Sequence, residues 1–332
     1  MTATFRPKAK GRPVKLQRQQ GRRWVNVAQG RQDRRGVVEF TAPYKVKRKI
    51  ATYRVLAGRY DGLKSVRSLG VKTSQPGLAD FTDDFTGTAL DATKWGHRLQ
   101  DYSPVSQRTC SKSDPRAVSV SGGVVRLSVR NDPDRGGLLD PTPKCAYEGK
   151  NYEWRINGHI GTEGKHSFKY GYTAARMKFQ PRRGQHASFW SMPATQEAGE
   201  GSARLTGAEI DVIEWFGENH PQGGLASFIH HWPNDNKEGI TSQKVGGWLE
   251  KPGQYGGKWA DLYHVFSVEW TPKRYVFRID GQETFRTSKG VSGQEQFLIL
   301  SLLSSDYELT HLGGDGKLPQ TMQVDWVRTW ER

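Results

Sequence analysis

Cysteine and methionine are scarce in this chain of 332 residues, which contains 2 Cys and 4 Met. Two cysteines are too few for a structural zinc site, which needs about four ligands. Cys110 and Cys145 both lie in loop-like sequence rich in Gly, Pro and Ser. Such thiols usually stay free in a cytosolic protein and pair in a secreted one, so an extracellular protein would join them in a disulfide.

Long apolar runs and long helical periodicity are also lacking. No segment approaches the roughly 20 apolar residues of a membrane-spanning helix. The first 16 residues are basic and contain no apolar core, so they do not resemble a secretory signal peptide. We expect an extracellular, monomeric protein whose signal has been trimmed or which leaves the cell by another route.

Acidic residues are nearly missing from residues 1–72, which contain 20 Lys and Arg against 3 Asp and Glu, a net charge of +17. Residues 73–332 contain 30 against 31, a net charge of −1. The overall charge of +16 therefore belongs to the N-terminal segment. Its basic side chains either form a solvated surface or attract an anionic one, such as cell-wall polymer, acidic polysaccharide or nucleic acid.

Short strands separated by turn residues fill the N-terminal segment. This pattern predicts a small antiparallel β-sandwich over residues 1–72, followed by a linker over 73–79. The segment resembles the immunoglobulin-like or fibronectin-like modules that accompany many secreted bacterial enzymes. The predicted strands are Pro13–Gln17, Arg23–Val27, Gly36–Phe40 and Ala51–Leu56.

A second domain is predicted over residues 80–332, where ten of the eleven Trp lie. Short strands recur there without intervening helices, a pattern typical of an all-β sandwich or jelly roll. The predicted strands are Val118–Val120, Val124–Val129, Tyr170–Phe179, Ala187–Ser191, Glu209–Trp215, Leu225–Trp232, His264–Trp270, Arg274–Ile279, Gln296–Leu303 and Met322–Trp330.

The stretch Glu209–Glu214 places three acids among three β-branched residues. On a strand, Glu209 and Asp211 point to one face, whereas strict alternation sends Glu214 to the other. A β-bulge at Val212-Ile213 would return Glu214 to the acidic face. A retaining glycosidase needs two carboxyl groups about 5–5.5 Å apart, which this arrangement can supply. The alternative is an exposed acidic face that serves solubility.

The flanks of this stretch resemble glycoside hydrolase family 16, in the branch of laminarinases and agarases that carries the bulge. The resemblance covers residues 80–332 and implies a concave β-jelly roll of the concanavalin A type. The matching segments, in family order, are Asp84-Phe85 with Trp95, Tyr170–Lys178, Ser188–Pro193, Glu209–Glu214, His264–Pro272 with Ile279–Gly281, and Met322–Arg328.

The resemblance assigns Glu209 as the nucleophile and Glu214 as the acid/base, with Asp211 holding Glu209 in place. A Glu next to other carboxyl groups and an aromatic wall is expected to have a raised pKa.

By the same resemblance, a second set of residues is expected to bind the substrate. The set consists of Arg176, His186, Trp190, His230 and Trp232. Trp190 would stack on sugar rings, and His230 would lie next to the acid/base. A core role for Trp190, His231 in place of His230, and a structural role for Arg176 are the alternatives. Trp215 is expected to face the core.

Three departures from the laminarinase pattern lie in substrate-facing sequence, one of them the loop Gly217–Pro221 after Glu214. His186 stands where laminarinases carry a sugar-stacking Trp, and Ser301 replaces a common Asn. These changes bear on which polymer is cut rather than on how it is cut.

Family members often hold a structural calcium ion, for which Asp325 and Asp84 are the candidate ligands here. No cofactor is required for the reaction. An ordinary structural role for both acids is the alternative.

The sequence therefore predicts an endo-acting retaining β-glycosidase, with β-1,3-glucan as the default substrate. An agarase-type or carrageenase-type galactanase, a transglycosylase, and a non-catalytic carbohydrate-binding protein on the same fold are the alternatives.

Overall fold

The computed structural model describes residues 1–34, 36–40, 42, 45–47, 49–73, 79–136, 142–195, 202–231 and 243–331. Most of the predicted linker, and Trp232, lie outside the described residues. The chain forms two compact units, Met1–Ala79 with Arg278–Glu283, and Asp80–Phe277 with Thr284–Arg332. None of the described helices is long and apolar enough to cross a membrane.

The first unit is built from short antiparallel strands. A sheet in the order β3-β2-β7-β8, with β9 also on β7, is accompanied by the pairs β1-β4 and β5-β6. Val14 and Leu16 on β2 are fully buried and share a core with Phe5, Val38 and residues of β7. The strands are β1 (Thr2–Thr4), β2 (Pro13–Gln20), β3 (Arg23–Arg31), β4 (Val37–Glu39), β5 (Lys45–Val46), β6 (Lys49–Ile50), β7 (Thr52–Ala57), β8 (Val66–Arg67) and β9 (Val71–Lys72). The likeness to immunoglobulin or fibronectin modules stays a prediction.

The second unit is a large antiparallel β-structure with little helix, which confirms the predicted all-β jelly roll. Its strands are β10 (Phe81–Asp83), β11 (Gly96–His97), β12 (Ser111–Ser113), β13 (Val118–Val120), β14 (Val125–Asn131), β15 (Cys145–Tyr147), β16 (Lys150–Tyr152), β17 (Arg155–Gly161), β18 (Gly171–Lys178), β19 (His186–Pro193), β20 (Glu209–Trp215), β21 (Leu225–His231), β22 (Gln243–Trp248), β23 (His264–Thr271), β24 (Arg274–Ile279), β25 (Gln282–Thr287), β26 (Gln296–Leu303) and β27 (Gln320–Trp330). The helices are the short α1 (Ala203–Thr206) and α2 (Asp306–Leu309) and the 3₁₀ turns η1 (Pro115–Ala117), η2 (Pro252–Tyr255) and η3 (Asp315–Lys317).

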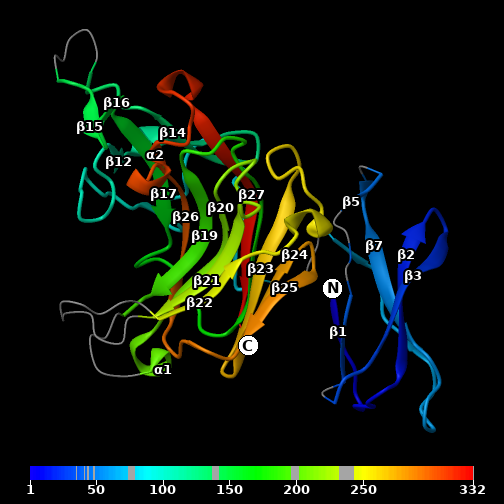
Figure 1. Cartoon of the computed structure of the whole chain (residues 1–332). Coiled ribbons are helices and arrows are strands. Elements are labelled where there is room, and N and C mark those ends of the chain that lie inside the picture. The colour runs from blue at the N-terminus through cyan, green and yellow to red at the C-terminus, as the bar shows by residue number, and fades with distance from the viewer. Residues whose placement is uncertain are drawn as a thin grey trace. The chain divides into compact units, whose positions relative to one another are not determined.

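Six strands of this unit form the curved sheet that carries the site. They run in the order β22-β21-β20-β19-β26-β17 and lie side by side (Figure 1). A second set, β14, β27, β18, β23, β24 and β25, continues from β17. Apolar residues such as Ile210, Phe189 and Leu300 are at most 1% exposed, so the apolar faces of the central strands lie in the core.

Strand β17 connects the two sets, and the sequence did not predict it. Its first half pairs with β12 and β14, and its second half, Gly158–Gly161, pairs with β26. A Cβ atom at Gly158 would lie 2.7 Å from the Leu127 Cβ atom, so the close approach of β14 requires glycine there. The strand has seven residues, of which two are glycines, so its intrinsic β-propensity is low. It forms because of its long-range pairing with neighbouring strands.

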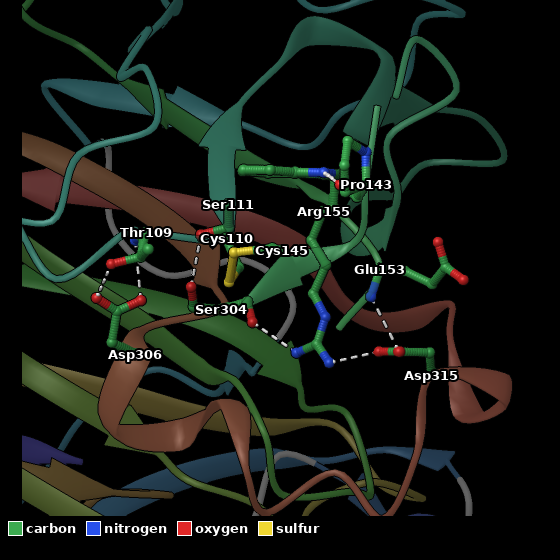
Figure 2. Close-up of a disulfide and its surroundings, with 11 residues drawn as sticks. Thr109, Cys110, Ser111, Pro143, Cys145, Glu153, Arg155, Ser304, Asp306 and Asp315 are labelled. Atoms are coloured by element: carbon green, nitrogen blue, oxygen red, sulfur yellow. Dashed lines mark hydrogen bonds and ion pairs between the residues drawn. A yellow bond between two sulfur atoms is a disulfide. The ribbon is translucent and has the colours of Figure 1, made fainter. Parts of the chain in front are cut away.

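One end of the curved sheet is braced by a disulfide between Cys110 and Cys145, with a Cα–Cα distance of 5.5 Å (Figure 2). The bond packs against Leu309 of α2 and three partly buried aromatic side chains. Next to it, the Thr109 N–H and hydroxyl groups donate to the Asp306 carboxylate at 2.9 and 2.7 Å. The loop before β12 is thereby fastened to α2.

The disulfide closes a loop between positions 35 residues apart. Replacing both cysteines with serine is expected to lower the free energy of unfolding by about 2–4 kcal/mol, because the unfolded chain regains loop entropy. Urea unfolding of both proteins, with and without reductant, measures this. Reductant should destabilise only the parent protein, and an unchanged parent curve would contradict the prediction.

Candidate active site

The three acids of β20 face the same side of the curved sheet. Ile210, Val212 and Ile213 are 1–2% exposed and point into the core. Asp211 pairs with Phe228 of β21, and Glu214 pairs with Ala226, so two residues of β20, Val212 and Ile213, oppose the single residue Ser227 of β21. The pairing with β19 is shifted in the same way. The β-bulge therefore lies at the predicted position and turns Glu214 to the face of Glu209 and Asp211.

A buried hydroxyl group holds this bulge. Ser227 of β21 lies opposite the extra residue and is 2% exposed. Its hydroxyl donates to the Val212 carbonyl oxygen at 2.9 Å. A bulge removes one carbonyl from the regular ladder, and a buried carbonyl without a partner costs free energy. Ser227 supplies that partner and so stabilises the irregular backbone.

The strand register sets the neighbours of each acid. Glu214 lies in a row with Ser188 of β19 and Ser301 of β26. Asp211 lies between Trp190 and Phe228. Glu209 lies in a row with His230 of β21 and Lys244 of β22.

These rows form the floor of a cavity of about 440 Å³. All three acids contribute to its lining, together with residues of neighbouring strands and of α2. The remaining lining residues are Arg108, His186, Ser188, Trp190, Phe216, Phe228, His230, Lys244, Trp248, Ser301, Leu303, Tyr307 and Glu308.

Burial is the largest influence on the pKa values of the three acids. It raises the pKa of Glu209 and of Glu214 to about 7, and for Glu214 the charge of Glu209 adds to the effect. Burial, followed by the charges of both Glu residues, raises the pKa of Asp211 well above its usual range. A protonated Asp211 hydrogen-bonds Glu209 and favours its ionised form. Because the pKa values of Glu209 and Glu214 both lie near 7, the row holds both protonated and ionised carboxyl groups near neutral pH.

His230 lines the cavity, as expected, but its position corrects one detail of the prediction. Its Nε2 atom lies 3.4 Å from Asp211 Oδ2, and its ring groups with Asp211 and Glu209 rather than with Glu214. Burial, aided by Lys244, lowers its pKa to about 4, so the ring is neutral at pH 7. His231 faces the opposite side and contacts the Thr206 hydroxyl at 2.9 Å.

Trp190 and His186 both line the cavity. The Trp190 indole N–H donates to the Ser301 hydroxyl at 3.0 Å, which fixes the ring beside the acids. His186 is 5% exposed and stacks on Phe216 and Tyr307, with ring centroids 5.3 and 5.7 Å away. Burial lowers its pKa to about 3, so it contributes a neutral, flat surface.

Another part of the cavity wall comes from the segment that the disulfide braces. Arg108 lines the cavity and is fixed by donation to the backbone oxygens of Ser106 and Gln107, the latter at 2.9 Å. Glu308 of α2 is 4% exposed and accepts from the Gly184 N–H group at 3.3 Å. Burial raises the pKa of Glu308 to about 7. Together they place a cation and a titratable acid in the same cavity as the row of three acids.

Arg176 corrects another prediction, since it is not part of the cavity lining. It lies on β18, forms an ion pair with Asp325 and lies 4.5 Å from the centroid of the Tyr263 ring. Asp84 likewise pairs with Arg328, at 2.7 Å. Each of the two carboxylates expected to bind calcium therefore has an arginine as its partner, and the calcium site stays a prediction. Trp215 is 2% exposed and faces the core, as predicted.

Several lining residues were missed by sequence reasoning. Arg108 comes from a loop and Tyr307 and Glu308 from α2, all far from the acidic strand in sequence, and no spacing connects them to it. Phe228 lies on β21, next to β20, where alternation along the strand offered a signal, whereas Lys244 and Trp248 lie on β22, one strand further out.

A curved sheet that carries a row of carboxyl groups in a cavity is an arrangement that fits the glycoside hydrolases. The family model described as beta-porphyranase A-D, GH16 domain, matches residues 77–332. The chain therefore belongs to this family of glycoside hydrolase family 16 domains, which confirms the predicted resemblance.

Curated relatives and solved structures agree with this assignment. Glucan endo-1,3-beta-glucosidase A1 of Niallia circulans is 25% identical over 80% of this chain and 40% of its own length. The beta-glucanase of Rhodothermus marinus is 24% identical over 62% of this chain and 64% of its own length. The chain thus spans less than two thirds of these relatives. The laminarinase catalytic domain of Thermotoga maritima shares the fold, with a TM-score of 0.57, 19% identity, and coverage of 77% of this chain and 98% of that one.

Ser227→Ala tests the support of the bulge. The variant leaves the Val212 carbonyl buried without its partner, so the free energy of unfolding should fall by about 1–2 kcal/mol. Turnover should fall as well, because Glu214 loses its fixed orientation. Urea unfolding and initial rates are the measurements, with Ser119→Ala on an exposed position of β13 as the control. Equal rates in the two variants would contradict the role given to Ser227.

Proposed function

We propose that this protein is an endo-acting retaining glycoside hydrolase that cleaves a β-linked polysaccharide. The observation that carries the proposal is the row of Glu209, Asp211 and Glu214 on the floor of one cavity, brought together by the bulge. Membership of a glycoside hydrolase family supports it. Relatives whose names specify endo-cleavage support the mode of action.

In this proposal Glu209 attacks the anomeric carbon and forms a covalent glycosyl-enzyme ester. Glu214, whose pKa burial raises to about 7, donates its proton to the leaving oxygen. It then removes a proton from the attacking water, which releases the sugar with retained configuration. Asp211 hydrogen-bonds Glu209 and orients it. Ser188, whose hydroxyl lies 3.4 Å from Glu214 Oε1, positions the acid/base.

The aromatic side chains of the cavity support a sugar substrate. Trp190 offers a flat apolar surface for the C–H face of a pyranose ring. Phe216, Phe228 and Trp248 extend this surface along the cavity. His230, neutral and held against Asp211, is placed to exchange hydrogen bonds with sugar hydroxyls.

The relatives favour β-1,3-glucan as the substrate, since the Niallia circulans protein is named for that linkage. A second candidate is porphyran, a sulfated galactan, for which the matching family is named. Two cations in the cavity wall, Arg108 and Lys244, favour this candidate because they suit a charged polymer. Departures from the laminarinase pattern at His186 and Ser301 point the same way.

Glu209→Gln and Glu214→Gln test the mechanism on a panel of β-1,3-glucan, agar, porphyran and carrageenan. Each variant should lose about 10²–10⁴-fold or more in turnover while it keeps its fold, because each removes a group that reacts or transfers a proton. New reducing ends are the measurement, and Glu250→Gln at an exposed position is the control.

The same panel separates the alternatives. Product chain lengths distinguish hydrolysis from transglycosylation, and the polymer that is cut identifies the substrate. Binding by the parent protein without any new reducing ends would contradict the enzymatic proposal and favour a carbohydrate-binding protein.

We also propose that the protein acts outside the cell, where the first unit holds it against an anionic wall or matrix. The Cys110–Cys145 disulfide is consistent with an oxidising compartment. The excess of 20 basic over 3 acidic residues in 1–72 supports attraction to an anionic polymer.

A variant with four exposed cations of the first unit neutralised, Lys15→Gln, Arg23→Gln, Arg67→Gln and Lys72→Gln, should elute from an anionic polysaccharide column at lower salt. Its turnover on soluble substrate should equal that of the parent. The control neutralises exposed cations of the second unit, Arg130, Lys150, Lys273 and Lys289. Equal shifts in both variants would show that retention reflects overall charge and not the first unit.

A further inference from the structure

A second cavity, of about 310 Å³, lies in the same unit and shares no lining residue with the first. Three segments distant in sequence form it, namely the loop after β18, the loop after β20 and the segment after α2. Its lining consists of Pro181, Arg182, Arg183, Glu218, Asn219, His311 and Leu312.

Positive charge dominates this lining. Two arginines and a histidine face one acid, Glu218. Within the described part of the chain, neither the Arg182 nor the Arg183 guanidinium group takes part in an ion pair, and the Arg183 Nε atom is buried without a hydrogen-bond partner. Burial and the charge of Arg183 lower the pKa of His311. An anion bound in this cavity would be attracted by the two arginines and would favour the protonated form of His311.

Hydrogen bonds fix the backbone that carries the arginines. The Gln185 side-chain amide donates to the Arg182 and Arg183 carbonyl oxygens at 2.6 and 3.0 Å. The Glu218 N–H group donates to the Pro181 carbonyl oxygen at 2.8 Å. A Cβ atom at Gly217 would lie 2.5 Å from the Arg183 nitrogen, so the two loops pack together as closely as glycine permits. The cations are therefore presented by an ordered backbone.

The second cavity lies next to the catalytic one. Phe216 lines the catalytic cavity, and Glu218, two residues later, lines the second. Glu308 lines the catalytic cavity and accepts from Gly184, the neighbour of Arg183. A polymer longer than the catalytic cavity can therefore reach the arginines at this edge.

We propose that this second cavity is an anion subsite, in which Arg182, Arg183 and His311 hold a sulfate ester or carboxylate group of a polysaccharide that also occupies the catalytic cavity. The identification of the ligand as a polysaccharide rests on the proposed function, whereas the anion site itself does not. Arginine pairs bind sulfate and carboxylate oxygens through charge-assisted hydrogen bonds.

Inorganic sulfate tests the anion site without any turnover. In the full-length protein, the His311 ring signals are followed by NMR against pH, in sodium sulfate and in sodium chloride of equal ionic strength. An anion within about 4–6 Å favours the imidazolium form, so sulfate should raise the pKa of His311 by roughly half a unit and chloride should not. Arg182→Gln with Arg183→Gln should abolish the rise. His97, exposed and outside both cavities, is the internal reference.

The control variant removes two exposed charges elsewhere in the unit, Arg130→Gln with Lys273→Gln, and should keep the sulfate response. The anion site is overturned if sulfate does not change the His311 pKa in the parent protein. It is also overturned if sulfate changes that pKa equally in the double arginine variant.

Kinetics test the connection to the substrate. On porphyran, the double arginine variant should raise KM at least about fivefold with kcat unchanged, because it removes charge-assisted contacts away from the reacting bond. On β-1,3-glucan it should match the parent. An unchanged KM on porphyran, or a parent protein that cuts only neutral polymers, overturns the assignment to substrate. If the parent protein cuts none of the polymers, the proposed function is contradicted instead. The anion site, which the NMR titration tests without turnover, is not affected by that outcome.

Discussion

The β-bulge in β20 is the constraint on which the rest of the site depends. Without the extra residue, strict alternation would place Glu214 in the core with Ile210 and Val212. With it, three carboxyl groups share one face, and the apolar residues between them still fill the interior. The bulge leaves the Val212 carbonyl outside the regular ladder, and Ser227 supplies the hydrogen bond that it lacks. A single hydroxyl group thus stabilises the irregularity that creates the site.

Gathering three acids in a buried row has an electrostatic cost that the protein limits by sharing protons. The pKa values of all three are raised, chiefly by burial, so the row does not carry three charges at neutral pH. Lys244 lowers the pKa values of Asp211 and Glu214 and so offsets part of the effect. The result is an environment in which one carboxyl group can be protonated while another is ionised near neutral pH.

The other wall of the cavity has a separate origin. The disulfide and the Thr109–Asp306 hydrogen bonds fasten the loop that carries Arg108 to α2, which carries Tyr307 and Glu308 (Figure 2). The sheet therefore carries the three acids, and the braced segments add a charged surface to the same cavity.

The sequence by itself determined the family, the all-β architecture, the acidic strand with its bulge, and Trp190 in the cavity. It did so because these features are local: the alternation of side chains along a strand and the spacing of a motif can be recognised in consecutive residues. Tertiary structure alone decided the rest. It placed Arg108 and Glu308 beside acids about 100 residues away, paired Arg176 with Asp325 instead of with substrate, and formed β17 despite its glycines. Those outcomes follow from long-range pairing and burial, which no short stretch of sequence encodes.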